Sequence, residues 1–188
     1  MVFITGPSGS GKSTLRDYYC RMRGIKPIAA VTTRPPREGE TEIHKSVGDN
    51  RFKELLNKQK LCLVSQNHGF WYGYEKAAVS QTAKYPMILE VDSQTAIRES
   101  VMYGALVLRV IPCSIAKALH LIKQKRDEIE DRLKDLEEQT DETFLSRRIE
   151  VGDLVFVNEY DHASEERFLR LLDSLTEQNG TCETSHED

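Results

Sequence analysis

The sequence has few of the features that would place a chain outside the ordinary globular proteins. Its four cysteines, Cys20, Cys62, Cys113 and Cys182, show no paired spacing among 188 residues, so neither a disulfide framework nor a zinc site is expected. No apolar run approaches the ~20 residues that a membrane span needs. The apolar stretch at the N-terminus covers only residues 2–4, which argues against a signal peptide. We therefore expect a cytoplasmic protein that does not contact a membrane.

A strong excess of either charge is also lacking. The chain carries 26 basic and 30 acidic side chains, a formal net charge of -4. A protein that coats nucleic acid needs a broad basic face, so no nucleic-acid partner is expected, and any anion site must be local. A length of 188 residues suits a single domain with a sizeable core. Oligomeric state is left open by the sequence.

Short apolar runs alternate with segments of helical period along most of the chain. This alternation predicts an α/β protein with a parallel sheet flanked by helices. The expected strands are residues 2–5, 27–31, 61–64, 86–91, 106–111 and 154–157. The expected helices are residues 12–22, a short one around 52–56, 92–103, a long one beginning at 115, and a last one that contains 168–175.

Breaks in this alternation divide the expected domain, residues 1–178, into parts. The parts are a core in residues 1–31 and 74–178, an inserted subdomain in about 32–73, and a charge-rich helical segment in about 123–148. A disordered tail is expected to follow the domain in residues 179–188. The segment 123–148 has a thin apolar stripe, a pattern typical of a helix that stands in solvent.

The strongest motif is a phosphate-binding loop near the N-terminus. Residues 6–13, GPSGSGKS, fill the whole pattern G-x-x-x-x-G-K-[ST] between an expected strand and an expected helix. Such a loop points successive N–H groups at a phosphate, and the helix N-terminus adds the positive end of its dipole. Lys12 is expected to reach the β- and γ-phosphates of ATP, and the Ser13 hydroxyl to bind Mg²⁺. The residues expected to bind ATP are Gly6, Ser8, Gly9, Ser10, Gly11, Lys12, Ser13 and Thr14.

A second anion site is indicated by the segment VTTRPPREGE, residues 31–40. Arg34 and Arg37 lie three positions apart on a loop stiffened by two prolines, and two planar guanidinium groups can converge on one anion. The alternative for this segment alone is a solvated turn with two ordinary arginines.

A phosphate-binding loop followed by T-T-R-x-P-R-x-G-E closely resembles the guanylate kinase family. The resemblance covers about residues 2–175 and implies a P-loop NTPase-type fold, in which the inserted subdomain of about 32–73 binds the acceptor and residues 123–148 form a helical lid. It also implies that Arg34 and Arg37 hold the phosphate of an acceptor. Tyr72, in the segment GFWYG, matches the family tyrosine that contacts the same phosphate, and Asn158, in LVFVNE, matches the asparagine beside the donor adenine.

The segment LEVDSQ, residues 89–94, resembles the family's strand end L-D-I-D-x-Q. Glu90 and Asp92 are therefore expected in the acceptor site. Either carboxylate, at the end of a strand, is also well placed to hold Mg²⁺ through water opposite Ser13, and Asp92 is assigned to the metal with Ser13. A helix cap is the alternative for Asp92.

The resemblance further implies a lid arginine that neutralises the transferred phosphoryl group, since phosphoryl transfer needs positive charge on the equatorial oxygens. The candidates in this segment are Arg126, Arg132, Arg147 and Arg148. Arg148 fits best the family arginine on the helix after the lid, and it joins Lys12, Arg34 and Arg37 in the expected catalytic set. Arg126 and Arg132 could instead be surface charges paired at helical spacing.

Departures from the family fall on the part that reads the acceptor base. The glutamate expected nine residues before Tyr72 is Leu63, which cannot accept hydrogen bonds from guanine. A family serine corresponds to Ala30, and a family tyrosine to His44.

Three functions stay open at this stage. The first is ATP-dependent phosphorylation of a small phosphorylated acceptor, GMP or a related nucleoside monophosphate. The second is the same transfer to a sugar phosphate, because residues 42–44, 61–63 and 68–69 resemble the ribose bisphosphate phosphokinases. The third is a non-catalytic interaction module, against which the intact Lys12 and Ser13 argue.

Overall fold

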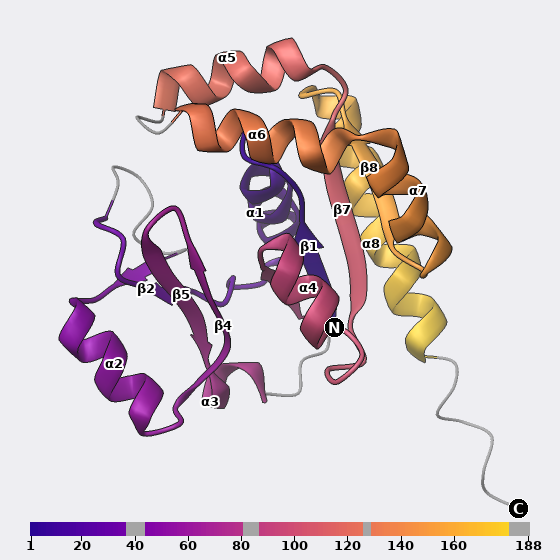
Figure 1. Ribbon diagram of the computed structural model, residues 1–188. Helices are drawn as coiled ribbons and strands as arrows, with labels where there is room; N and C mark the ends of the chain where they lie inside the picture. The colour runs from indigo at the N-terminus through magenta and orange to yellow at the C-terminus, as the bar shows by residue number, and fades with distance from the viewer. Residues whose placement is uncertain (37–43, 81–86, 126–128, 181–188) are drawn as a thin grey trace, which may run out of the picture.

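The computed structural model describes residues 1–36, 44–80, 87–125 and 129–180 (Figure 1). In chain order, its elements are β1 (Val2–Thr5), α1 (Lys12–Arg23), β2 (Ala30–Thr32), β3 (His44–Ser46), α2 (Asp49–Asn57), β4 (Leu61–Asn67), β5 (Phe70–Glu75), α3 (Lys76–Val79), β6 (Ile88–Glu90), α4 (Ser93–Glu99), β7 (Leu106–Pro112), α5 (Ile115–Lys125), α6 (Ile129–Thr140), α7 (Glu142–Glu150), β8 (Leu154–Asn158) and α8 (His162–Gly180).

The first sheet is the centre of the fold and has the order β6-β1-β7-β8. All three of its pairings are parallel. Its strands are mostly apolar because both faces are covered by helices, as in other parallel sheets, with polar residues at their carboxyl ends and Arg109 within β7. The predicted α/β fold, with a parallel sheet flanked by helices, is confirmed.

Alternate residues of β1 point to the two sides of this sheet. Val2 and Ile4 pack with residues of α1 and α8, such as Tyr19 and Phe168. Phe3 packs on the other side, in a cluster that includes Ala96 of α4. Strand β1 therefore contributes side chains to two separate clusters of the core. The loop that follows β1 begins at the centre of the first sheet.

The second sheet has the order β3-β2-β5-β4 and lies with α2 beside the first one (Figure 1). It is mixed, since β2 pairs with β3 in parallel and with β5 antiparallel. The strand predicted at residues 27–31 was placed in the core, and this assignment is wrong. The strand forms at Ala30–Thr32 and belongs to the second sheet, because Val31 packs against Phe52 and Leu61 of that sheet and its helix.

A bulge interrupts the pairing of β4 with β5 between Cys62 and Ser65. Within it, Leu63 adopts a φ of 50°, which is uncommon for a residue that has a side chain. The bulge re-aims the side chains that follow it, as bulges beside binding sites commonly do. Leu63 itself is buried, with 5% of its surface exposed.

The long helix predicted after residue 115 is wrong: the segment forms α5, α6 and α7. Leu136 of α6 is fully buried against Ala118 and Ile122 of α5, so the expected solvated stripe is in fact a packing face. Asp141 begins α7 by accepting a hydrogen bond from the backbone N–H of Phe144 at 2.9 Å. Helix α4 is also shorter than expected, ending at Glu99.

The C-terminal helix extends further than expected and reaches Gly180, two residues into the predicted tail. The rest of that tail, residues 181–188, lies outside the described residues. Within the described parts of the chain, no helix combines the length and the apolar character needed to cross a membrane.

Candidate active site

The loop between β1 and α1 needs glycine because neighbouring atoms leave no room for a side chain. Gly6 has a φ of 137°, and a Cβ there would lie 2.1 Å from the carbonyl oxygen of Val110 on β7. Gly11 has a φ of 85°, and its Cβ would lie 2.3 Å from the side-chain Nδ2 of Asn158. Since real Cβ atoms do not approach other atoms this closely, a side chain at either position would force the surrounding structure to shift.

Two side chains, one at the end of β8 and one two residues later, hold the loop by hydrogen bonds. Asn158 donates from Nδ2 to the carbonyl oxygen of Ser10 at 2.8 Å, and its Oδ1 accepts from the N–H of Tyr160 at 2.9 Å. The Tyr160 hydroxyl donates to the carbonyl oxygen of Gly9 at 2.8 Å. Asn158 was expected beside the donor adenine; here its amide braces the phosphate-binding loop.

Lys12 begins α1 and curls back over the loop. Its Nζ donates to the carbonyl oxygen of Pro7 at 2.8 Å. Burial lowers the pKa of Lys12, and the negative charges of Glu90 and Asp135 oppose this shift. A polyphosphate bound beside Lys12 would stabilise its charged form, because a nearby negative charge offsets the cost of burying the ammonium.

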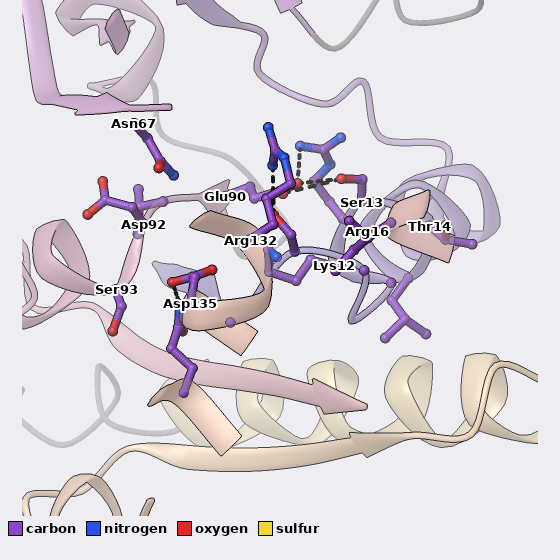
Figure 2. Close-up of a pocket in the computed structure, with 18 of the residues that line it drawn as sticks. Lys12, Ser13, Thr14, Arg16, Asn67, Glu90, Asp92, Ser93, Arg132 and Asp135 are labelled. Atoms are coloured by element: carbon purple, nitrogen blue, oxygen red, sulfur yellow. Dashed lines mark hydrogen bonds and ion pairs between the residues drawn. The ribbon is translucent and has the colours of Figure 1, made fainter. Parts of the chain in front are cut away.

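The carboxylate of Glu90 is the centre of the polar cluster in this site (Figure 2). Its Oε2 accepts from the Ser13 hydroxyl at 2.9 Å and lies 3.2 Å from Nη1 of Arg16. Burial acts to raise the pKa of Glu90, but the charges of Arg16 and Lys12 outweigh burial and hold the pKa below its ordinary value. Glu90 is therefore a carboxylate at neutral pH.

The carboxylate that contacts Ser13 is thus Glu90, whereas Asp92 was expected to share the metal with Ser13. Asp92 precedes α4 as its N-cap, with Oδ1 accepting from the Thr95 N–H at 2.9 Å and Oδ2 from the Thr95 hydroxyl at 2.7 Å. Figure 2 shows it apart from Ser13. The helix cap was the alternative reading of Asp92, and it explains both contacts.

The donor set at this point fits magnesium. A hydroxyl and an ionised carboxylate 2.9 Å apart are the hard oxygen ligands that Mg²⁺ prefers. Among the described residues, no group of three or more His, Cys, Asp or Glu side chains forms a metal site. Such a pair suits Mg²⁺ that arrives with a nucleotide, because this ion usually keeps waters and takes the remaining oxygens from phosphates.

The expected acceptor residues lie on the facing side, in and next to the second sheet. Arg34 is buried, with 5% of its surface exposed, and its backbone N–H donates to the Thr32 hydroxyl at 3.1 Å. Tyr72 of β5 stacks edge-on with His44 of β3, with ring centroids 6.4 Å apart. Arg37, the second expected phosphate ligand, lies outside the described residues.

Two lid arginines have different surroundings. Arg132 of α6 is buried and donates from Nη1 to the Ser8 hydroxyl of the loop at 2.8 Å. Arg148 of α7 instead pairs with Asp153, with Nε 2.8 Å from Oδ2.

Arg148 was expected to reach the phosphates, and in this structure its guanidinium instead pairs with Asp153. Asp153 is buried before β8, and it also pairs with Arg109, whose side chain is 1% exposed. A buried carboxylate between two arginines holds both firmly. Of the other lid candidates, Arg147 is exposed on α7, and Arg126 lies outside the described residues.

One cleft joins these groups. It has a volume of about 1840 Å³ and is lined by the loop residues with Lys12 and Ser13, by Arg34 and Tyr72, and by Arg132 of the lid. A single small-molecule site usually occupies ~300–1,000 Å³, so the cleft has room for a donor and an acceptor together. Leu63, Ala30 and His44 also line it, so the three departures from the family pattern face the expected ligands.

Several polar residues of the cleft were missed from the sequence. These are Arg16, Asp17, Tyr74, Asp135 and Tyr160. Arg16 and Asp17 carry a weak signal, because both are charged yet follow the phosphate-binding loop within the first turns of a helix that packs on the core. The Tyr74 hydroxyl donates to the carbonyl oxygen of Glu90 at 2.8 Å, a contact that no local pattern announces.

Comparisons with known proteins agree with this geometry. Residues 1–167 match the family described as "Guanylate kinase". A guanylate kinase of Methylobacillus flagellatus is 30% identical over 184 residues, which cover 93% of this chain and 85% of that protein. A guanylate kinase of Trichodesmium erythraeum is 32% identical over 123 residues, covering 62% of this chain and 66% of that protein. The crystal structure of a guanylate kinase from Anaplasma phagocytophilum shares the fold, with a TM-score of 0.70, 19% identity, and coverage of 100% of this chain and 97% of that one.

Proposed function

Since the chain belongs to the guanylate kinase family, we propose that it transfers the γ-phosphoryl group of ATP to the phosphate of a nucleoside monophosphate, with GMP the first acceptor to test. The observation that supports the proposal is that one cleft is lined by both sets of residues expected to bind phosphate. Lys12, Ser13 and Arg132 line its donor side, and Arg34 and Tyr72 line its acceptor side.

In this proposal the donor side is built around the β1–α1 loop. The N–H groups of residues 9–13 cradle the β-phosphate, and the Lys12 ammonium exchanges the Pro7 carbonyl for phosphate oxygens. Mg²⁺ bound with ATP would be held by Ser13 and Glu90 and would neutralise charge on the β- and γ-phosphates.

On the acceptor side, Arg34 holds the acceptor phosphate in line with the γ-phosphate, with Arg37 as its expected partner. The guanidinium plane offers two parallel donors to a phosphate, which fixes orientation as well as position. Arg132 of α6 lies over the loop and adds positive charge where the phosphoryl group passes. Transfer then depends on positioning and charge, as is general for this chemistry.

A sugar phosphate is the second candidate acceptor, and a specific observation favours it. Leu63 and Ala30 give the base end of the cleft apolar surface where a guanine would need a carboxylate and a hydroxyl. Losing such a bidentate acceptor costs roughly 2–4 kcal/mol of base discrimination, because guanine donors stay unpaired.

The experiment that tests both candidates offers ATP with GMP, AMP, UMP or ribose 1,5-bisphosphate in separate reactions and measures ADP release. The Lys12→Ala variant is the control for contaminating kinases. Activity on GMP supports the first candidate, and activity on ribose 1,5-bisphosphate alone supports the second. If none of these acceptors supports ADP release, both candidates are contradicted.

A further inference from the structure

We propose that Arg16 is a positioning residue that holds the Glu90 carboxylate against Ser13 and thereby shapes the site for the magnesium–nucleotide complex. The inference rests on the proposed function, because it takes that complex as the donor. Arg16 belongs neither to the phosphate-binding loop nor to the residues assigned to the acceptor.

The position of Arg16 on α1 brings it to the site. It follows Lys12 by four residues and Ser13 by three, so the three side chains share one face of the helix. Only 3% of its side chain is exposed. A buried guanidinium is costly unless its donors are matched to negative groups, and the two carboxylates that match them are Asp17 and Glu90.

The donors of Arg16 are divided between these carboxylates. Nε and Nη2 lie 3.0 and 2.9 Å from Oδ1 of Asp17. This fork fixes the plane of the guanidinium and leaves Nη1 to Oε2 of Glu90 at 3.2 Å. The same Oε2 accepts from the Ser13 hydroxyl, so Asp17, Arg16, Glu90 and Ser13 form one continuous series, which Figure 2 shows in part.

A glutamate at this strand end needs such an anchor. Its side chain has one more rotatable bond than an aspartate, so its carboxylate is less well fixed by the backbone. The planar fork of an arginine removes that freedom, which a lysine does less completely because its ammonium is a point charge. Partners that orient a ligand of a metal commonly change metal affinity by ~10–100-fold when they are mutated.

The test separates this role from simple charge compensation in the core. ATP binding is measured by titration calorimetry with Mg²⁺ and again in EDTA, and the ratio of the two affinities is the metal-dependent gain. Arg16→Met should reduce this gain by about tenfold or more, while ATP affinity in EDTA stays within about twofold. Arg16→Lys should recover part of the gain. Arg21→Met is the matched control, because Arg21 is exposed on the same helix, and it should leave both affinities unchanged.

Every outcome bears on the inference. An Arg16→Met protein that loses thermal stability but keeps the wild-type gain shows a structural role and overturns it. If Arg16→Met does not fold, Asp17→Asn decides, because this change weakens the fork and keeps Arg16: a reduced gain supports the inference, and an unchanged gain overturns it. A wild-type protein that does not bind ATP with Mg²⁺ would overturn the proposed function itself. If the wild type does bind, and its metal-dependent gain equals that of Arg16→Met, only the role of Arg16 is overturned.

Discussion

The hydroxyl of Ser13, on the first turn of α1, lies 2.9 Å from Oε2 of Glu90 at the end of β6. The two residues are 77 positions apart, and they meet because β1 and β6 are parallel neighbours whose carboxyl ends share one edge of the sheet. This edge is where ligands of open α/β sheets bind. The pair therefore connects the helix after the phosphate-binding loop to the carboxyl end of β6.

Removing the loop lysine should stop the transfer and leave the fold intact. We expect Lys12→Ala to lower kcat by about 10²-fold or more, because a preorganised charge at the transferred phosphate is lost. The one hydrogen bond that Lys12 makes to Pro7 is within the loop, so thermal unfolding should change little. Steady-state kinetics and a melting curve provide the two measurements. A variant that keeps more than about a tenth of kcat would contradict the role of Lys12.

Arg34 should affect the acceptor and spare the donor. Arg34→Ala should raise the acceptor KM and leave the affinity for ATP close to that of the wild type. The measurement is KM for the active acceptor beside the Kd for ATP. A tenfold weaker affinity for ATP with an unchanged acceptor KM would place Arg34 at the wrong phosphate. Because Arg34 is buried, Arg34→Lys serves as the more conservative second variant.

Substituting Arg132 and substituting Arg148 should have different effects, one on kcat and the other on the stability of the fold. Arg132→Met should lower kcat, since Arg132 contacts the loop through Ser8. Arg148→Met should instead destabilise the fold by ~1.5–3 kcal/mol, the usual value for a hydrogen bond to a charged group, because Arg148 pairs with the buried Asp153. Denaturant unfolding and kcat are measured for both. A large loss of kcat in a fully stable Arg148→Met protein would restore Arg148 to the catalytic set.

Base selectivity should be low. With Leu63 lining the cleft, we expect kcat/KM for GMP and AMP to differ by less than about two orders of magnitude. Leu63→Glu should improve selectivity for GMP. The same change could unfold the second sheet, because Leu63 is buried and a carboxylate without a partner is costly there, so melting temperature is recorded beside the kinetics. A wild-type preference for GMP above about 10⁴ would show that other residues read guanine.

The start of α8 should give the fold a measurable pH dependence. Asp161 accepts a hydrogen bond from the N–H of Ser164 at 2.8 Å, and this contact lowers the pKa of Asp161. A carboxyl whose pKa is lower in the folded state stabilises the fold above its unfolded pKa of ~3.9 and loses that contribution as the pH falls through the folded value. Asp161→Asn keeps the acceptor and removes the titration. As the pH falls from 6 to 3, the difference in unfolding free energy between wild type and Asp161→Asn should therefore shrink. A difference that stays constant with pH would contradict the contribution of Asp161.

Much of the site could be predicted because its signals are local. The loop from Gly6 to Ser13 is a short motif whose geometry follows from its glycines, and β1 and α1 lie where the pattern of apolar residues put them. Tyr72 was found through a resemblance alone, whereas Arg34 was indicated by its spacing from Arg37 and then supported by the resemblance. The structure places both in the cleft.

The errors have a common physical cause, which is contact between distant parts of the chain. The strand at Ala30–Thr32 is apolar enough for either sheet, and only Phe52 and Leu61 decide that it joins the second one. The lid was expected in solvent because its stripe is thin, whereas Leu136 is buried on α5. Arg148 was assigned from its place in a motif, and a carboxylate that is distant from that motif, Asp153, determines where its side chain lies.

The braces behind the phosphate-binding loop have a consequence for how the protein is made. Asn158 holds Ser10, which lies 148 positions earlier, and Tyr160 holds Gly9, which lies 151 positions earlier. During synthesis from the N-terminus, the loop leaves the ribosome long before β8 does. The loop is translated before β8 but can acquire its braced shape only afterwards. A nascent chain that ends before residue 158 should therefore lack a formed phosphate-binding loop.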